Sequence, residues 1–268
     1  MDLQVLVATM EQKDDSLLQK MNISSKAIIG NQCECNKIEV ISYQGHEVIF
    51  YSFQDKGVGL NRNNIFMRAT EDICLFADDD VVYEAGYRIQ ILEEFERHPN
   101  ADVILFNVIS KTKGREDNIT KAFKRLHAID CVNFCAYRIA VRTERIRKAN
   151  IHFSLLFGGG AKYGSGEDCI FLRDCIKKGL RLYASPCRIG YVEHEASTWF
   201  EGYNYKLFYD KGALFANISR LFSRIYYLGF LSFVSKSDPD VFKKAISYKD
   251  DYKIMVRGGK EFCSRKRV

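Results

Sequence analysis

The first half of the chain alternates short apolar runs with segments of helical periodicity. Four runs have the length and composition of buried strands: residues 3–9, 27–30, 73–77 and 101–109. Three segments are predicted to be helical: 16–21, 59–69 and 85–98. Residues 38–43 and 47–53 flank Gln44-Gly45-His46 and predict a hairpin or two adjacent strands. Strands that alternate with helices predict a parallel α/β sheet covered on both faces.

The second half continues this alternation and then becomes helical. Its predicted elements are a charged loop at 111–120, strands at 134–141, 181–185 and 189–194, and helices at 143–149 and 168–178. Residues 157–166 contain five glycines and predict a flexible loop. From Tyr203 onward the pattern is helical and aromatic. Because no linker composition interrupts the chain, we expect one α/β domain followed by a helical C-terminal extension.

The net charge of +6 lies in the C-terminal tail. Residues 243–268 hold nine Lys or Arg and three Asp or Glu, whereas residues 1–242 hold 31 residues of each sign. A protein that binds duplex nucleic acid normally spreads basic residues over a folded face, so we expect no nucleic-acid partner. A basic tail suits an anionic membrane surface better.

The cysteines and the N-terminus indicate a reduced, cytoplasmic protein. The nine cysteines are odd in number and irregularly spaced, and several lie inside apolar segments, so they read as core residues rather than disulfide partners. Cys33 and Cys35 lack a second Cys/His pair at zinc spacing. The N-terminus has no basic region followed by a cleavage site. The uncharged stretch at 225–235 is too short to span a bilayer.

Three carboxylates follow the strand at 73–77 directly: Asp78, Asp79 and Asp80. Ligands of open α/β sheets bind at the carboxyl ends of the strands. Adjacent carboxylates repel one another unless a cation offsets them, and oxygen ligands suit Mg²⁺ or Mn²⁺. The plainer interpretation is a solvated acidic turn before the helix at 85–98.

Three further features bear on the chemistry. The run Gly57–Asn64 opens a helix and includes Arg62, a combination that favours anions. Glu167 and Asp168 begin the helix after the glycine loop, either as a cap or with Asp168 as a general base. His194 follows an apolar strand, where it is either structural or a metal ligand.

These motifs, in this order, resemble the family 2 glycosyltransferases, which have the GT-A fold. The matching elements are two strands with polar ends, the G-x-G-x-N-R-N helix, a strand ending in D-x-D, the G-E-D helix and a strand closing in V-x-H, over residues 3 to 200. The resemblance implies a mixed, mainly parallel sheet flanked by helices. It also implies a catalytic domain at 1–200, with a nucleotide-sugar half at 1–110 and an acceptor half at 111–200, followed by a basic helical extension at 201–268.

The resemblance implies a role for each site residue. Asp168 would be the general base, with Glu167 orienting the base or the acceptor. The donor would be bound by Thr9, Asn31, Gln32, Arg62, Asp78 and Asp79. Asp80, Asp78 and His194 would hold Mn²⁺ or Mg²⁺. The family often has an aspartate at the end of the second strand, where this chain has Gly30-Asn31-Gln32, although amides can also bond a uracil edge.

The resemblance implies an inverting transfer from a nucleotide sugar, with UDP as the expected nucleotide, to a hydroxyl of a glycan or lipid-linked acceptor, as in bacterial-type polysaccharide biosynthesis. The sequence leaves alternatives: a haloacid-dehalogenase-type phosphatase using Asp78 and Asp80, a nucleotidyltransferase, or a non-catalytic nucleotide-sugar-binding protein. The apolar, basic segment at 218–234 has two interpretations. Either it packs on the catalytic domain, or it lies on the inner face of an anionic membrane as a peripheral contact.

Overall fold

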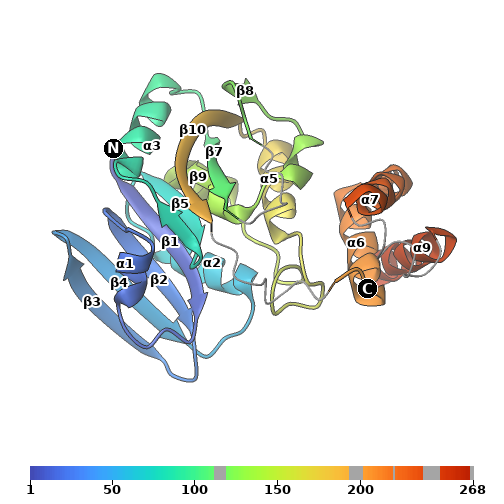
Figure 1. The fold of residues 1–268 in the computed structure, drawn as a ribbon, viewed down its shortest axis with the longest axis horizontal. Helices are drawn as coiled ribbons and strands as arrows, with labels where there is room; N and C mark the ends of the chain where they lie inside the picture. The colour runs from blue at the N-terminus through green and yellow to red at the C-terminus, as the bar shows by residue number, and fades with distance from the viewer. Residues whose placement is uncertain (112–118, 193–201, 220, 238–247, 266–268) are drawn as a thin grey trace.

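A ten-stranded mixed sheet forms the centre of the protein (Figure 1). The structure, a computed structural model, describes residues 1–111, 119–192, 202–219, 221–237 and 248–265. The strands follow the order β3-β4-β2-β1-β5-β9-β7-β10-β6, and β8 (Lys124–Arg125) pairs with β10. This arrangement confirms the expected α/β class with a mixed, mainly parallel sheet.

The N-terminal half of the sheet is parallel apart from its edge. Its parallel strands are β1 (Leu3–Met10), β2 (Lys26–Gln32), β4 (His46–Phe53) and β5 (Ile73–Asp78). The edge strand β3 (Lys37–Tyr43) pairs antiparallel with β4, which confirms the predicted hairpin. Apolar side chains of β1 and β5 are buried on both faces, as the continuous apolar runs predicted.

The other half of the sheet corrects two predictions. Instead of a strand at 134–141, a short 3-10 turn, Ala136–Arg138, precedes β9 (Ile139–Arg142). The turn places the buried Arg138 guanidinium against the carbonyl of Phe106, at 2.7 Å. The two predicted strands at 181–185 and 189–194 form one strand, β10 (Leu182–Val192). Its register shifts beyond Ala184, next to Pro186, which has no N–H for the ladder.

The remaining strands complete this half. β7 (Val103–Ser110) is parallel to β10, β9 is antiparallel to both β5 and β7, and β6 (Val81–Tyr83) is antiparallel to β10. The sequence did not predict β6, which follows the acidic triplet directly. The triplet therefore lies in a tight turn between two buried strands rather than in a loop that leads to a helix.

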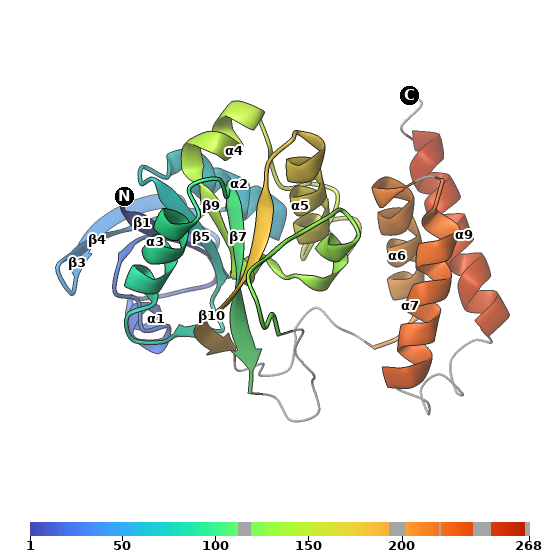
Figure 2. The same cartoon turned by 90° about the horizontal axis from the view of Figure 1, so that it is seen from above.

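Helices cover both faces of the sheet (Figures 1 and 2). α1 (Ser16–Lys20) and α3 (Tyr87–Arg97) bury apolar side chains in one core cluster. α2 (Val58–Arg68), α4 (Thr143–Ala149) and α5 (Glu167–Lys177) contribute to the other. Between β9 and the preceding strands, Asp130–Asn133 forms another 3-10 turn.

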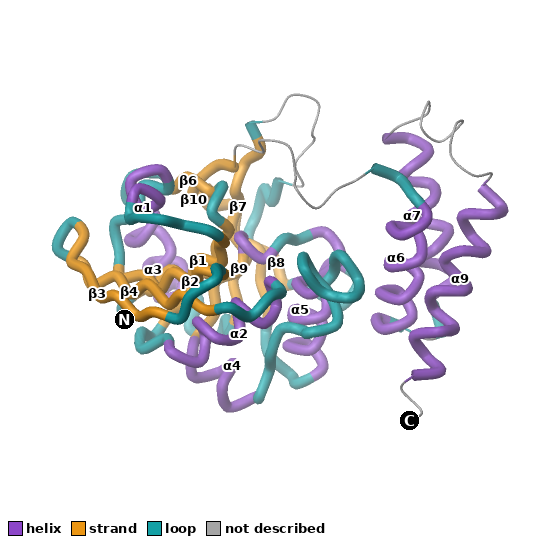
Figure 3. Tube along the Cα trace, turned by 90° about the horizontal axis from the view of Figure 1, so that it is seen from below, coloured by secondary structure: helices purple, strands orange, loops and turns teal. Residues whose placement is uncertain are grey.

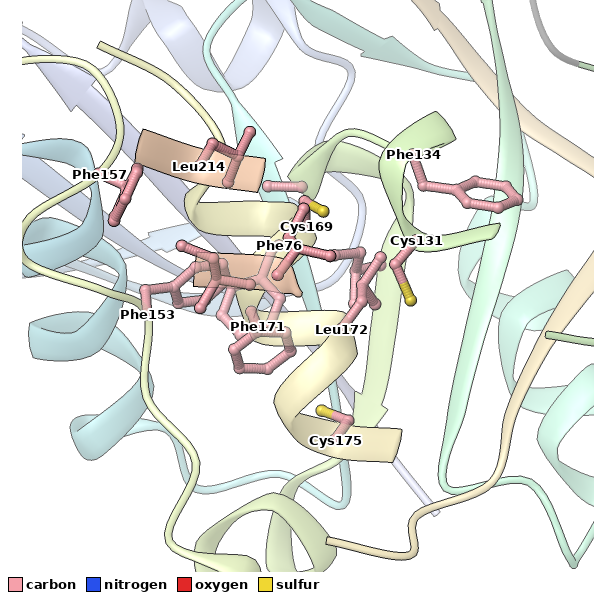
Figure 4. Close-up of a cluster of buried hydrophobic side chains, with 14 of the residues drawn as sticks. Phe76, Cys131, Phe134, Phe153, Phe157, Cys169, Phe171, Leu172, Cys175 and Leu214 are labelled. Carbon is pink, nitrogen blue, oxygen red and sulfur yellow. The ribbon is translucent and has the colours of Figure 1, made fainter. Parts of the chain in front are cut away.

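An aromatic cluster fixes β5 to α5 (Figure 4). The ring of Phe76 meets that of Phe153 edge to face, with 4.9 Å between centroids. Phe153 in turn stacks on Phe171 of α5 at 4.3 Å. Buried aromatic pairs add directional contacts to the burial of large apolar surfaces. The cluster therefore holds the end of β5 and the start of α5 in a fixed relation.

The C-terminal extension is a group of helices beside the α/β part (Figures 2 and 3). It consists of α6 (Tyr205–Ile218), α7 (Ser223–Ser237) and α9 (Tyr248–Arg265). α6 and α9 approach each other closely at glycines: a Cβ at Gly212 would lie 2.0 Å from the Met255 carbonyl oxygen. A Cβ at Gly258 would lie 2.1 Å from the Tyr209 carbonyl oxygen. These glycines let the two backbones touch.

The apolar segment at 218–234 is not one continuous helix. Ile218 is the last residue of α6, and α7 begins at Ser223. Ser219 has an extended backbone, and its hydroxyl accepts a hydrogen bond from the Phe222 N–H. Hydroxyl side chains favour such local turns over a continued helix. None of the described helices is both long and apolar enough to cross a bilayer.

Candidate active site

The carboxyl ends of four parallel strands bring the predicted donor-binding residues to one edge of the sheet. The register pairs Ala8 with Asp78 and Thr9 with Asn31. Gln32 pairs with Phe53 at the end of β4. Thr9, Asn31, Gln32 and the acidic triplet therefore share the edge at which open α/β sheets bind ligands.

Arg62 joins two acidic motifs that lie far apart in the sequence. It projects from α2, is only 3% exposed, and donates to Asp78 Oδ1 at 2.6 Å and to Glu167 Oε1 at 2.7 Å. Burial alone would lower the pKa of this guanidinium, but the two carboxylates raise it above its usual value. The structure thus places Arg62 between the start of α5 and the end of β5, with its charge directed to protein carboxylates.

The three carboxylates of the acidic triplet have different partners and environments. Asp78 is bound by Arg62, and Asp79 accepts a hydrogen bond from the Thr9 hydroxyl. Burial raises the pKa of Asp80 to about 6, and the charges of Asp78 and Asp79 add to that rise. A divalent cation would offset this repulsion. The triplet is therefore electrostatically suited to a bound cation.

The triplet fits a metal shared with substrate rather than a site made by protein alone. Within the described ranges, no three His, Cys, Asp or Glu side chains are grouped so that they could hold a metal ion. Mg²⁺ and similar ions are often held by one or two carboxylates together with substrate phosphates. His194, the third ligand expected from sequence, lies outside the described residues.

The amides proposed to face the nucleotide base also hold the site together. Asn31 is buried, accepts from the Gln12 N–H at 3.0 Å and donates to the Gln12 carbonyl at 2.9 Å. Gln32, which is partly exposed, donates to the Asp55 carbonyl at 2.6 Å. Buried Asn61, which sequence analysis did not single out, donates to the Gly30 carbonyl at 2.7 Å. The sequence feature that could have identified Asn61 is its position inside the G-x-G-x-N-R-N run.

At the start of α5, two neighbouring acids have different environments. Glu167 is buried and bound by Arg62. Asp168 is only partly buried and accepts from the Cys169 N–H at 2.7 Å. Burial, together with the adjacent charge of Glu167, raises the pKa of Asp168 to about 7. A carboxylate with that pKa can take up a proton near neutral pH.

The glycine-rich loop at 157–166 is packed rather than free, which corrects the expectation of a flexible loop. Gly158 and Tyr163 are joined by a backbone hydrogen bond of 2.8 Å, and the side chains of Phe157 and Tyr163 are buried. Their rings also meet Phe262 of α9. The loop is therefore enclosed by aromatic contacts that its glycine content did not reveal.

The extension also reaches this loop through polar groups that sequence analysis missed. Buried Asp210 of α6 accepts from the Gly164 N–H at 2.8 Å. Lys211 donates to the Ser165 hydroxyl at 3.1 Å, and its charge acts to lower the pKa of Asp168. The sequence feature that could have indicated this contact is an aspartate, Asp210, inside an otherwise apolar run. The structure thus shows α6 and α9 packed on the α/β part, whereas the segment at 218–234, which is mainly α7, packs on α6 and α9.

Comparison with known proteins identifies the architecture. Residues 34–163 match the model of the family described as "Glycosyl transferase family 2". The crystal structure of S. aureus TarS 1-349 in complex with UDP-GlcNAc is similar, with a TM-score of 0.63 at 14% identity, over 96% of this chain and 79% of that one. A further crystal structure of S. aureus TarS 1-349 is similar with a TM-score of 0.61 at 13% identity, over 98% of this chain and 83% of that one.

The longer S. aureus TarS chain matches over 49% of its length, again at 14% identity. A search of curated proteins found no match. At these identities the structural likeness shows the fold, and it confirms the expected GT-A architecture. The family match supports neither the phosphatase nor the nucleotidyltransferase alternative. Residues 34–163, just under half of the chain, therefore match a glycosyl transferase family 2 domain, and the fold of the chain is similar to that of TarS.

Proposed function

We propose that this enzyme transfers a sugar, with inversion, from a UDP-linked donor to an acceptor hydroxyl. The observation that carries the proposal is Arg62, which binds Asp78 at the donor edge and Glu167 beside the candidate base. The two halves of a displacement reaction need a held leaving group and a base near the incoming hydroxyl. Arg62 connects the groups suited to each task.

On the donor side, we assign the nucleotide to the ends of β1, β2 and β5. The Thr9 hydroxyl donates a hydrogen bond to Asp79. Of the two amides, Gln32 is the better placed to contact the nucleotide base, because Asn31 is buried against Gln12. Asp78 would contact the ribose or the metal. Arg62 acts in this scheme by positioning carboxylates rather than by binding the nucleotide. The UDP-GlcNAc bound by TarS supports a UDP-linked donor here.

Asp80, with Asp78 and His194, would hold Mn²⁺ or Mg²⁺. Such an ion would offset the charge of the departing nucleoside diphosphate. The raised pKa of Asp80, about 6, fits a group whose anionic form gains from a nearby cation. Protons compete with metal for such a carboxylate, so we expect metal affinity to fall as the pH drops below about 6.

Asp168 would accept the proton of the acceptor hydroxyl as its oxygen bonds to the anomeric carbon. The bond from that carbon to the diphosphate breaks, and a single displacement inverts the configuration. Burial, and after it the charge of Glu167 that Arg62 fixes, raises the pKa of Asp168 to about 7. The N–H of Cys169 orients the carboxylate.

The acceptor would be a hydroxyl of a glycan or of a lipid-linked glycan. We place its binding in the half of the catalytic domain at 111–200, which includes the packed glycine loop next to Asp168. The basic tail at 243–268 supports a peripheral contact with an anionic membrane, at its cytoplasmic face, where lipid-linked acceptors would be met.

Calorimetric titration with UDP and UDP-GlcNAc, with and without Mn²⁺, tests the donor half of this proposal. We expect Mn²⁺-dependent binding that Asp80→Asn weakens by roughly tenfold or more, because the diphosphate loses its shared cation. Asp168→Asn is the matched control, since it lies outside the donor edge and should leave UDP affinity unchanged. Equal UDP affinity of the Asp80→Asn variant and wild type in Mn²⁺ would contradict the assignment.

A further inference from the structure

The C-terminal helices form an open pocket of about 380 Å³ that lies outside the candidate active site. Arg224 of α7 and Lys260 of α9 line it, together with the hydroxyl-bearing Ser223, Tyr227 and Ser264. No Asp or Glu is among the described residues that line the cavity. Its volume is in the range of small-molecule pockets, and its two basic side chains suit an anion such as a phosphate.

The two basic side chains at the cavity differ from their neighbours on α9. Lys253 pairs with Asp250 at 2.9 Å, and Arg257 pairs with Glu261 at 2.9 Å. Across the part of the chain that the structure describes, neither Arg224 nor Lys260 forms an ion pair, and both are exposed. Their charges are therefore available to an external anion.

Large apolar side chains are exposed next to this cavity. Leu221 is 81% exposed, Phe222 55% and Ile225 66%, and the last two flank Arg224 closely in sequence. The opposite side of α7 is buried through Leu231 and Val234. A helix that is apolar on both sides normally has a partner on each. One side of α7 packs on the other helices, and its exposed side is available to an apolar medium.

We propose that this part of the C-terminal extension binds an anionic bilayer, with a lipid phosphate in the cavity and Leu221, Phe222 and Ile225 in the interfacial layer. Apolar side chains beside unpaired basic ones are the combination that binds such an interface. A second copy docked symmetrically on this patch would bring Arg224 and Lys260 against their own equivalents, and like charges repel. The inference deepens the membrane contact proposed above and does not depend on the transfer chemistry.

Flotation of the full-length protein with vesicles tests the charged half of the site. We expect wild type to bind phosphatidylcholine vesicles that contain phosphatidylglycerol, and to be released by salt or by omission of the anionic lipid. The double variant R224E/K260E should bind at least roughly 25-fold more weakly, about fivefold for each lost basic contact. The matched control K124E/R125E makes the same charge change on exposed residues of β8 and should bind like wild type. An equal loss of vesicle affinity in both double variants would show that only net charge matters, and it would contradict the proposed site.

A second pair of variants tests the apolar half. Ile225→Ser should weaken vesicle binding severalfold, whereas Ile38→Ser, at a 65% exposed position of edge strand β3, should not. Titration with inorganic phosphate separates the sources of the anion: phosphate binding without vesicle binding would overturn the lipid assignment, as would a dimer that buries Ile225. UDP binding, measured on the same variants, should be unchanged. Loss of vesicle binding with intact UDP binding would therefore support the lipid site without bearing on the transferase proposal. Failure of the wild type to bind UDP would contradict the transferase proposal and leave the lipid site unaffected.

Discussion

Charge at individual residues determines how the candidate site works. Arg62 is buried between two carboxylates, so its removal would leave negative charges close together with no compensation, a change that typically costs about 3–5 kcal/mol. Asp168 is the opposite case, since its environment favours the neutral form up to near neutral pH. One acid of the G-E-D motif, Glu167, is thus held in an ion pair with Arg62, and the other, Asp168, is available for proton transfer.

The pKa of Asp168 predicts the pH dependence of transfer. Its folded-state pKa is raised to about 7, so the carboxyl is protonated and inactive as a base below that pH. We expect the rate of donor turnover to rise with pH through about 7 and to fall roughly tenfold per unit on the acidic side. Asp168→Asn should lose roughly 10²-fold in rate and abolish this acidic limb, as measured by UDP release. An unchanged limb in the variant would show that another group titrates.

The glycine loop and α6 contact each other, which the residue pattern of neither segment predicts. On one side, the Val58 N–H at the start of α2 donates to the Gly159 carbonyl at 2.9 Å. On the other, Asp210 of α6 accepts from the Gly164 N–H. The loop thus connects the helix that carries Arg62 with the extension. Its backbone is fixed at both flanks while its glycines allow the tight turns between them.

Replacement of Asp210 tests that connection. Asp210→Ala leaves the Gly164 N–H without its acceptor, and we expect it to lower the free energy of unfolding by about 1–3 kcal/mol. Lys206→Ala is the comparison, because it removes the exposed ammonium partner of the same aspartate but keeps the acceptor for the Gly164 N–H, so we expect a smaller loss of stability. Urea unfolding of both variants measures the difference. Equal stabilities would mean that the Asp210 contact contributes little.

Much of the fold was predictable from the sequence, because its elements are local. The buried strands β1 and β5 and the helices α2 and α5 follow from the periodicity of their apolar positions. The order of motifs indicated which strand ends carry polar groups. The Arg62–Glu167 pair could not be predicted, since it joins residues 105 positions apart. The pair joins α2 to α5, and both helices contact β5 through Phe76, which meets Phe66 of α2 and Phe171 of α5.

Other features could not be predicted from the sequence, because tertiary contacts override what local composition favours. Five glycines predicted mobility at 157–166, but burial of Phe157 and Tyr163 fixes the loop. The helical pattern from Tyr203 onward gave no sign of a break, but the backbone turns after Ile218. Close packing of α6 on α9 at Gly212 depends on backbone approach, which a residue pattern does not encode.

At the scale of the whole molecule, the extension covers part of the α/β domain. Phe262 of α9 meets Phe157 and Tyr163, and Leu214 of α6 lies against Gly166 at the start of α5. These contacts lie directly behind the candidate base. We therefore propose that the boundary at residues 200–201 separates two parts of one cooperative unit rather than two independent domains.

Truncation tests this cooperativity. A chain that ends after Gly202 exposes Phe157 and Tyr163 and loses the acceptor for the Gly164 N–H, so we expect its melting temperature to fall by roughly 10 °C or more. A chain that ends after Ser264 keeps Phe262 and should melt like the full-length protein. Calorimetric scans of the three lengths make the comparison. If the shorter truncation melts at the full-length temperature, the α/β part is an independent domain.

The guanidinium of Arg62 also limits how this sequence can evolve. A lineage that loses Arg62 keeps two carboxylates that then repel each other, and a lineage that loses Glu167 keeps a buried cation with half its compensation. Either intermediate is penalised before a second change can restore neutrality. Drift at these positions must therefore proceed by paired substitution or not at all, whereas a solvent-facing neighbour on the same helix, such as Met67, is free to vary.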